Sequence, residues 1–149
     1  MHFFLAGDPP TITAQERRIG KRKDGSLYIY EDRELKEVRM QLRARLSKVA
    51  PEDPMDGPLR LVVKWMFPNG QHKHGTYKTT KPDTDNLNKM LKDVMTDMGF
   101  WKDDALIAIE EVWKMYSDEP GIVIRIETLN PDIANEDDER IKDSAIHPM

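Results

Sequence analysis

The chain has 149 residues, of which 34% are charged, and a formal net charge of −4. This length is typical of one domain, which buries roughly 70% of its unfolded surface without the help of disulfides. The absence of cysteine excludes disulfides, thiolate metal sites, iron–sulfur clusters and cysteine nucleophiles. No apolar run reaches the ~18 residues of a membrane span, so we expect a soluble, cytoplasmic protein.

The charges are unevenly distributed along the chain. Residues 1–80 carry 15 Lys and Arg against 10 Asp and Glu, whereas residues 81–129 carry 6 against 11. Residues 130–149 carry 2 against 6 and show no apolar periodicity, which predicts a flexible acidic tail behind a domain of residues 1–129. A basic first half is consistent with nucleic-acid contact, although a solvated surface gives the same pattern.

The first half of the domain is predicted to contain two strands and a helix. His2–Leu5 is a short apolar strand, and Leu27–Tyr30 alternates in the manner of a second strand. The segment between them, Thr11–Ser26, is polar and includes five basic residues within seven positions: Arg17, Arg18, Lys21, Arg22 and Lys23. From Asp32 to about Val49 the residues favour a helix whose apolar stripe consists of Leu35, Val38, Leu42 and Leu46.

The second half is predicted to contain three strands and another helix. Leu59–Phe67 alternates strictly between apolar and other residues, as a half-buried strand does. A helix from about Asn86 to Met98 ends where Gly99 provides a C-terminal cap. Strands follow at Ala105–Tyr116 and Ile122–Thr128. This order predicts an α+β fold with two helices packed on a mixed β-sheet of about four strands.

Acidic residues flank the second helix on both sides. Asp83 and Asp85 precede or begin it, Asp103 and Asp104 follow it, and Lys89 lies on its polar face. Clustered carboxylates repel one another unless a cation neutralises them. Oxygen ligands favour Mg²⁺ or Mn²⁺, and a nearby lysine can stabilise charge that develops on a phosphate.

Several of these residues also have a purely structural interpretation. Asp85 is suited to cap the helix N-terminus, and Asp103 and Asp104 are common turn residues. His72 and His74 are interpreted as loop residues because no third metal ligand lies near them in sequence.

A calcium-binding EF-hand loop is excluded. Counting from Asp83, position six is Asn88 instead of glycine and position twelve is Val94 instead of glutamate.

The segments Lys81-Pro-Asp-Thr-Asp-Asn-Leu-Asn-Lys89 and Gly99-Phe-Trp-Lys-Asp-Asp-Ala105 resemble the signature of the RusA family of Holliday junction resolvases, often encoded by phages and prophages. The resemblance implies a homodimeric, metal-dependent endonuclease that cleaves paired strands of four-way DNA junctions in recombination and repair. It further implies that Asp83, Asp85 and Asp104 are catalytic and hold Mg²⁺, or Mn²⁺, that Lys89 is needed for cleavage, and that Asp103 is a further candidate ligand.

The candidate DNA-binding residues are basic and precede the acidic motif: Arg17, Arg18, Lys21, Arg22, Lys23, Lys73, Lys78 and Lys81. Two other functions remain open. One is a protein that binds DNA junctions or single strands without cleaving them, and the other is a structural or assembly protein with a charged surface.

Overall fold

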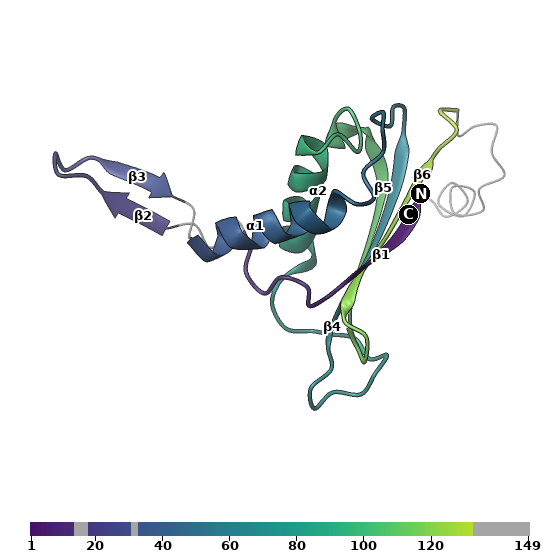
Figure 1. Cartoon of the computed structure of the whole chain (residues 1–149), viewed down its shortest axis with the longest axis horizontal. Coiled ribbons are helices and arrows are strands. Elements are labelled where there is room, and N and C mark those ends of the chain that lie inside the picture. Colours follow the sequence, from purple (N-terminus) through teal and green to yellow (C-terminus); the bar gives the residue numbers. More distant parts are fainter. Residues whose placement is uncertain (14–17, 31–32, 133–149) are drawn as a thin grey trace, which may run out of the picture.

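The computed structural model describes residues 1–13, 18–30 and 33–132. A four-stranded sheet of order β1-β6-β4-β5 has both helices packed on one face (Figure 1). Its strands are β1 (His2–Ala6), β4 (Leu59–Pro68), β5 (Ile107–Ser117) and β6 (Gly121–Thr128), and its helices are α1 (Arg33–Leu46) and α2 (Thr84–Asp97). β4 pairs parallel to β5, and the other pairs are antiparallel, so the predicted α+β fold with a mixed sheet is confirmed. Within the described residues, no helix is long and apolar enough to cross a membrane.

The core lies between the helices and the sheet, chiefly its two central strands β4 and β6. Every second residue of β4 is buried, as the alternation predicted: Leu59, Leu61, Val63, Trp65 and Phe67. The stripe of α1 contributes the buried side chains of Leu35, Leu42 and Leu46, with Val38 packed at its border. The stripe of α2 contributes the buried residues Leu87, Met90, Leu91, Val94 and Met95.

The two ends of α2 differ in how well they were predicted. The N-cap is Asp83, with extended backbone, and Asp85 lies in the first turn, so the interpretation of Asp85 as the cap is wrong. A carboxylate in the first turn is favourable because it interacts with the positive end of the helix dipole. Asp85 can therefore lie inside the helix, and the backbone of Asp83 provides the cap two residues earlier than predicted. At the other end, Gly99 has a φ of +80°, and the amide of Phe100 donates to the carbonyl of Met95, which confirms the predicted glycine stop.

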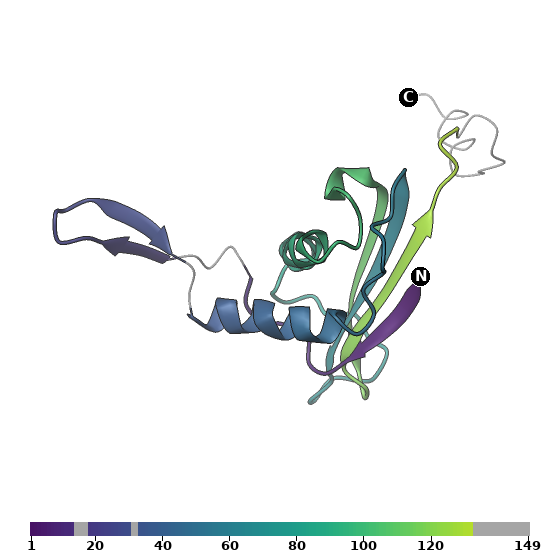
Figure 2. The ribbon, with the colours of Figure 1, turned by 45° about the horizontal axis from the view of Figure 1, so that its top comes forward.

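A separate antiparallel hairpin consists of β2 (Arg18–Lys21) and β3 (Leu27–Tyr30). Figure 2 shows that it extends away from the sheet and helices, beyond the N-terminal end of α1. β3 was predicted, but β2 was read as a polar segment because basic residues outnumber its single apolar side chain, Ile19. Ile19 pairs with Ile29 across the hairpin, and both side chains are exposed.

Candidate active site

Helix α2 separates the four aspartates into two pairs. Asp83 and Asp85 lie at its N-terminal end and are exposed. Asp103 and Asp104 lie beyond its C-terminal end, where a short 3-10 helix, η2 (Asp104–Leu106), leads into β5. A helix of 14 residues is about 21 Å long at roughly 1.5 Å per residue, so the pairs are well apart within one chain.

Contacts along β5 establish this direction. The side chain of Lys114, late in β5, reaches the residues just before Asp83, whereas Glu110, earlier in β5, contacts the middle of α2. The start of β5, and η2 before it, therefore lies at the C-terminal end of α2. Among the described residues, no three His, Asp or Glu side chains are grouped so that they could hold a metal ion.

The N-terminal pair has carboxylate oxygens that are available to a ligand. Asp83 caps α2 with its backbone only, and its side chain makes no capping hydrogen bond. Asp85 is in the first turn, and Lys89 is exposed one turn later on the same side of the helix. Two such carboxylates fit Mg²⁺, which commonly takes one or two from the protein and completes its shell with water and phosphate.

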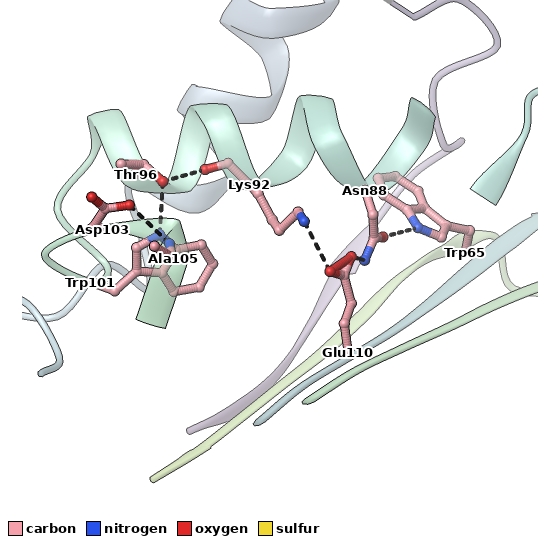
Figure 3. A network of polar contacts seen from close by, with 8 residues as sticks. All are labelled: Trp65, Asn88, Lys92, Thr96, Trp101, Asp103, Ala105 and Glu110. Atoms are coloured by element: carbon pink, nitrogen blue, oxygen red, sulfur yellow. Dashed lines mark hydrogen bonds and ion pairs between the residues drawn. The ribbon is translucent and has the colours of Figure 1, made fainter. Parts of the chain in front are cut away.

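The C-terminal pair is held more firmly. A side-chain oxygen of Asp103 accepts a hydrogen bond from the amide of Ala105 at 2.9 Å, so the interpretation of Asp103 as a turn residue is confirmed. The buried indole of Trp101 donates to Thr96 Oγ1 at 2.7 Å, and Thr96 in turn donates to the carbonyl of Lys92 (Figure 3). These contacts fasten the segment that carries Asp104 to the last turn of α2.

A chain of polar contacts, buried at Trp65 and Asn88 and partly exposed at Glu110 and Lys92, fixes the middle of α2 on the sheet (Figure 3). The indole of Trp65 donates to Asn88 Oδ1 at 2.8 Å, and the Asn88 amide donates to Glu110 Oε1 at 2.8 Å. Lys92 Nζ contacts the other oxygen of Glu110 at 2.9 Å. The chain joins β4, α2 and β5, so it sets the position of α2 and of the carboxylates at its two ends.

Lys114 anchors the segment that leads into α2. Its Nζ donates to the carbonyl of Thr80 at 2.5 Å and to that of Pro82 at 2.7 Å. Burial lowers the pKa of Lys114, nearby Lys78 lowers it further, and the charge of Asp83 opposes the shift. Sequence reasoning assigned no role to Lys114, although a lysine at an inward position of an alternating strand is a signal that could have found it.

The predicted DNA-binding residues belong to two separate elements. Lys21, Arg22 and Lys23 lie on the β2–β3 hairpin, where the guanidinium of Arg22 sits 4.9 Å from the centre of the Tyr28 ring. Arg18 begins β2, and Arg17 lies outside the described residues. The remaining candidates, Lys73, Lys78 and Lys81, lie in the loop between β4 and α2, which leads to Asp83.

Contacts within the loop distinguish its members. Lys78 Nζ donates to Thr80 Oγ1 and lies over the ring of Phe67, whereas Lys73 and Lys81 are exposed. His72 stacks on Tyr116 with ring centres 3.9 Å apart. His74 Nδ1 accepts a hydrogen bond from the amide of Asp118, and these contacts agree with the interpretation of both histidines as loop residues.

The protein is thus an α+β domain with exposed aspartates at both ends of one helix, and its similarity to known proteins identifies its family. The chain matches the family described as Endodeoxyribonuclease RusA over residues 9–127 and belongs to it. It is 32% identical to the protein named Crossover junction endodeoxyribonuclease rusA from Lactococcus phage r1t, over 76% of this chain and 88% of the phage protein. It is also 28% identical to the Bacillus subtilis (strain 168) protein named Uncharacterized protein YqaN, over 83% of this chain and 93% of that protein.

Proposed function

We propose that this protein is a Mg²⁺-dependent, structure-specific endonuclease that resolves four-way DNA junctions by paired phosphodiester cleavage. Membership of the RusA family supports a nuclease, and the name of the phage relative supports a crossover junction as the substrate. The observation that carries the chemistry is the exposed pair Asp83 and Asp85, in which Asp83 spends no side-chain oxygen on capping its helix. The process served would be DNA recombination or repair in the cytoplasm.

Asp83 and Asp85 would hold the metal, and Mn²⁺ could replace Mg²⁺ because both prefer oxygen ligands. When bound, such an ion lowers the pKa of a coordinated water and stabilises charge on the phosphate. Lys89, one turn further along α2, would contact the phosphate and neutralise part of the charge that develops during cleavage. Lys114 would act as a positioning residue through its bonds to Thr80 and Pro82.

A second copy of the chain would complete the site. Because α2, which is about 21 Å long, lies between the two aspartate pairs, one chain does not bring Asp104 together with Asp83 and Asp85. If the α2 helices of two copies lie antiparallel about a two-fold axis, Asp104 of the partner subunit approaches this pair, with Asp103 of the partner subunit beside it. The same symmetry creates two equivalent sites, as paired cleavage of a junction requires.

The basic residues would hold the DNA through its phosphates. The hairpin residues Lys21, Arg22 and Lys23 project from the body of the protein, where they can reach an arm of the junction (Figure 2). Lys73 and Lys81 are exposed in the loop before Asp83 and would contact the strand that is cut. Phosphate contacts of this kind give affinity that falls steeply with salt.

The first test compares a labelled four-way junction with a matched linear duplex, with and without Mg²⁺. We expect symmetric, Mg²⁺-dependent nicks in the junction only. Asp83→Asn should abolish them, and Asp8→Asn, the same change in an exposed loop, should not. Binding of the junction in EDTA with no nicking under Mg²⁺ or Mn²⁺ would instead identify a non-cleaving junction-binding protein.

A mixing experiment tests the shared site. Asp83→Asn and Asp104→Asn are each expected to be inactive alone. If the site is shared, a mixed dimer of the two variants places both changes in one site and leaves the other intact, so nicking of single strands should return. If each chain holds its own complete site, every site in the mixture carries one change, and no activity should return.

A further inference from the structure

An open pocket of about 350 Å³ lies at the outer edge of β5, beside the proposed cleavage site. Its lining residues come from the loop before α2, from the first residue of α2 and from β5: Tyr77, Lys78, Thr84, Val112, Trp113 and Lys114. Thr84 stands between Asp83 and Asp85 in the chain, so the pocket lies beside the segment that carries both carboxylates. Its volume is at the low end of small-ligand pockets, about 300–1,000 Å³, which suits one nucleotide.

Tyr77 is held in place although the residue is 70% exposed. The loop pairs with the edge of β5 through three backbone hydrogen bonds, from Gly75 to Tyr116, from Tyr116 to Thr76 and from Lys78 to Lys114. An exposed aromatic ring on an anchored backbone loses little conformational freedom when it binds a partner. Tyr77 is therefore suited to stack against a ligand.

Trp113 extends this aromatic wall. The rings of Tyr77 and Trp113 have centres 6.2 Å apart and are tilted by 39°. Trp113 pairs with Lys64 across the strands, and the ammonium of Lys64 lies 4.8 Å from the centre of the indole ring. Trp113 is only half-buried, in contrast to Trp65 and Trp101, which are 0% and 1% exposed. Its ring is thus placed for contact outside the core.

The charged side of the pocket faces the helices. Lys78 and Lys114 belong to it, and alternation along β5 places Lys114 on the opposite face of the sheet from Trp113. An aromatic surface bordered by lysines matches the chemistry of a nucleotide, whose base stacks on rings and whose phosphate is attracted to ammonium groups. A fully paired base within a duplex presents no free face to such a surface.

We propose that this pocket receives one unstacked nucleobase of the DNA strand that is cleaved at Asp83 and Asp85. The base stacks on Tyr77 and Trp113, and its phosphate lies toward Lys78, while Lys114, which is bound to the carbonyls of Thr80 and Pro82, adds positive charge to this side of the pocket. The proposal rests on the proposed nuclease function and adds a subsite to it. If a base must enter the pocket, the protein requires a DNA strand that is unpaired at the branch point. The identity of the base next to the cut then affects which junctions are cleaved.

The test is a double-mutant cycle between the ring of Tyr77 and a base of the DNA. The cut positions are first mapped with the unaltered protein, and abasic sites are then introduced singly at the nucleotides flanking the cut. At the nucleotide that occupies the pocket, removal of the base should lower the nicking rate about 10-fold, a typical effect of losing one base–aromatic stack. Tyr77→Ala should lower it similarly on intact DNA, with no further loss on the abasic junction. If the losses caused by Tyr77→Ala and by the abasic site multiply at every abasic position tested, the proposal is overturned.

Two variants serve as controls. Tyr77→Phe keeps the ring and should restore the nicking rate that Tyr77→Ala loses, together with the sensitivity to the abasic site. Phe4→Ala removes an exposed ring from β1, at a distance from the pocket lining, and should leave the dependence on abasic sites unchanged. Thermal unfolding of Tyr77→Ala checks that the variant is folded, and loss of activity with Tyr77→Phe as well would contradict stacking as the cause.

Fluorescence separates the pocket from the nuclease function. Because Trp65 and Trp101 are buried, quenching by DNA in EDTA reports chiefly on Trp113. The unaltered protein should be quenched by a four-way junction, and Tyr77→Ala should need about 10-fold more junction for the same quenching. Quenching without any Mg²⁺-dependent nicking would support the pocket and refute the nuclease. Nicking without quenching would do the reverse.

Discussion

Replacing Asn88 with aspartate tests the chain of polar contacts that positions α2. The side chain of Asn88 is fully buried, and the Trp65 indole, which can only donate, fixes the amide so that its nitrogen faces Glu110. Asn88→Asp keeps the size and the acceptor for Trp65. It replaces the donor to Glu110 with a carboxylate oxygen, so that two carboxylates meet where a 2.8 Å hydrogen bond existed.

The expected loss of stability has a lower and an upper bound. The lost hydrogen bond to a charged group contributes about 1.5–3 kcal/mol. The repulsion cannot cost more than protonating the new carboxyl, because a protonated carboxyl carries no charge. For a carboxyl with an ordinary pKa near 4, keeping the proton costs about 1.4 kcal/mol per pH unit, or about 4 kcal/mol at pH 7. We therefore expect a loss of about 2–4 kcal/mol at pH 7, which lowers the melting temperature by roughly 10 °C.

The pH dependence identifies the cause. The neighbouring charge raises the pKa of the introduced carboxyl in the folded state, so stability is retained at low pH and lost as the pH rises through that raised pKa. Urea unfolding of both proteins should therefore show a deficit that is largest at pH 7 and shrinks toward pH 4.5. Asn86→Asp, the same change in the first turn of α2, should be neutral or slightly stabilising. A deficit that is absent, or that is independent of pH, would show that Asn88 does not donate to a charged Glu110 in solution.

Two further predictions concern the end of α2 and the hairpin. Gly99→Ala forces a residue with a Cβ to adopt a φ of +80° and should lower the free energy of unfolding by about 1–2 kcal/mol, measured in urea. Replacing Lys21, Arg22 and Lys23 with alanine should weaken junction binding and reduce the slope of log K against log salt by up to about 3, because each phosphate contact contributes about 0.9. Lys48→Ala, an exposed change outside the hairpin, is the control.

Unchanged stability of Gly99→Ala would mean that the left-handed turn after α2 does not form in solution. An unchanged salt slope for the hairpin variant, with Lys48→Ala equal to it, would mean that the hairpin makes no phosphate contact. In that case the exposed lysines of the loop before Asp83 would have to provide the DNA contacts.

Local patterns in the sequence were sufficient for most of the fold. The strict alternation of Leu59–Phe67 and the stripe of α2 identify their buried faces, because a strand and a helix each repeat with a fixed period. Gly99 marks the end of α2 for an equally local reason, since a glycine accepts a positive φ without strain. The same patterns did not reveal β2, whose pairing with β3 supplies its stability and whose own residues are mostly basic.

The sequence also identified the aspartates, since they flank one helix and belong to a family signature. Their arrangement in space depends on how the whole domain folds. A rigid helix of 14 residues keeps Asp83 and Asp104 apart, and β5 returns beside it so that Lys114, and not Asp104, meets the segment before Asp83. The contacts of Asn88 with Glu110 and of Tyr77 with Trp113 likewise join residues more than twenty positions apart. No short-range pattern encodes such pairs, because strand pairing and packing bring them together only when the whole domain folds.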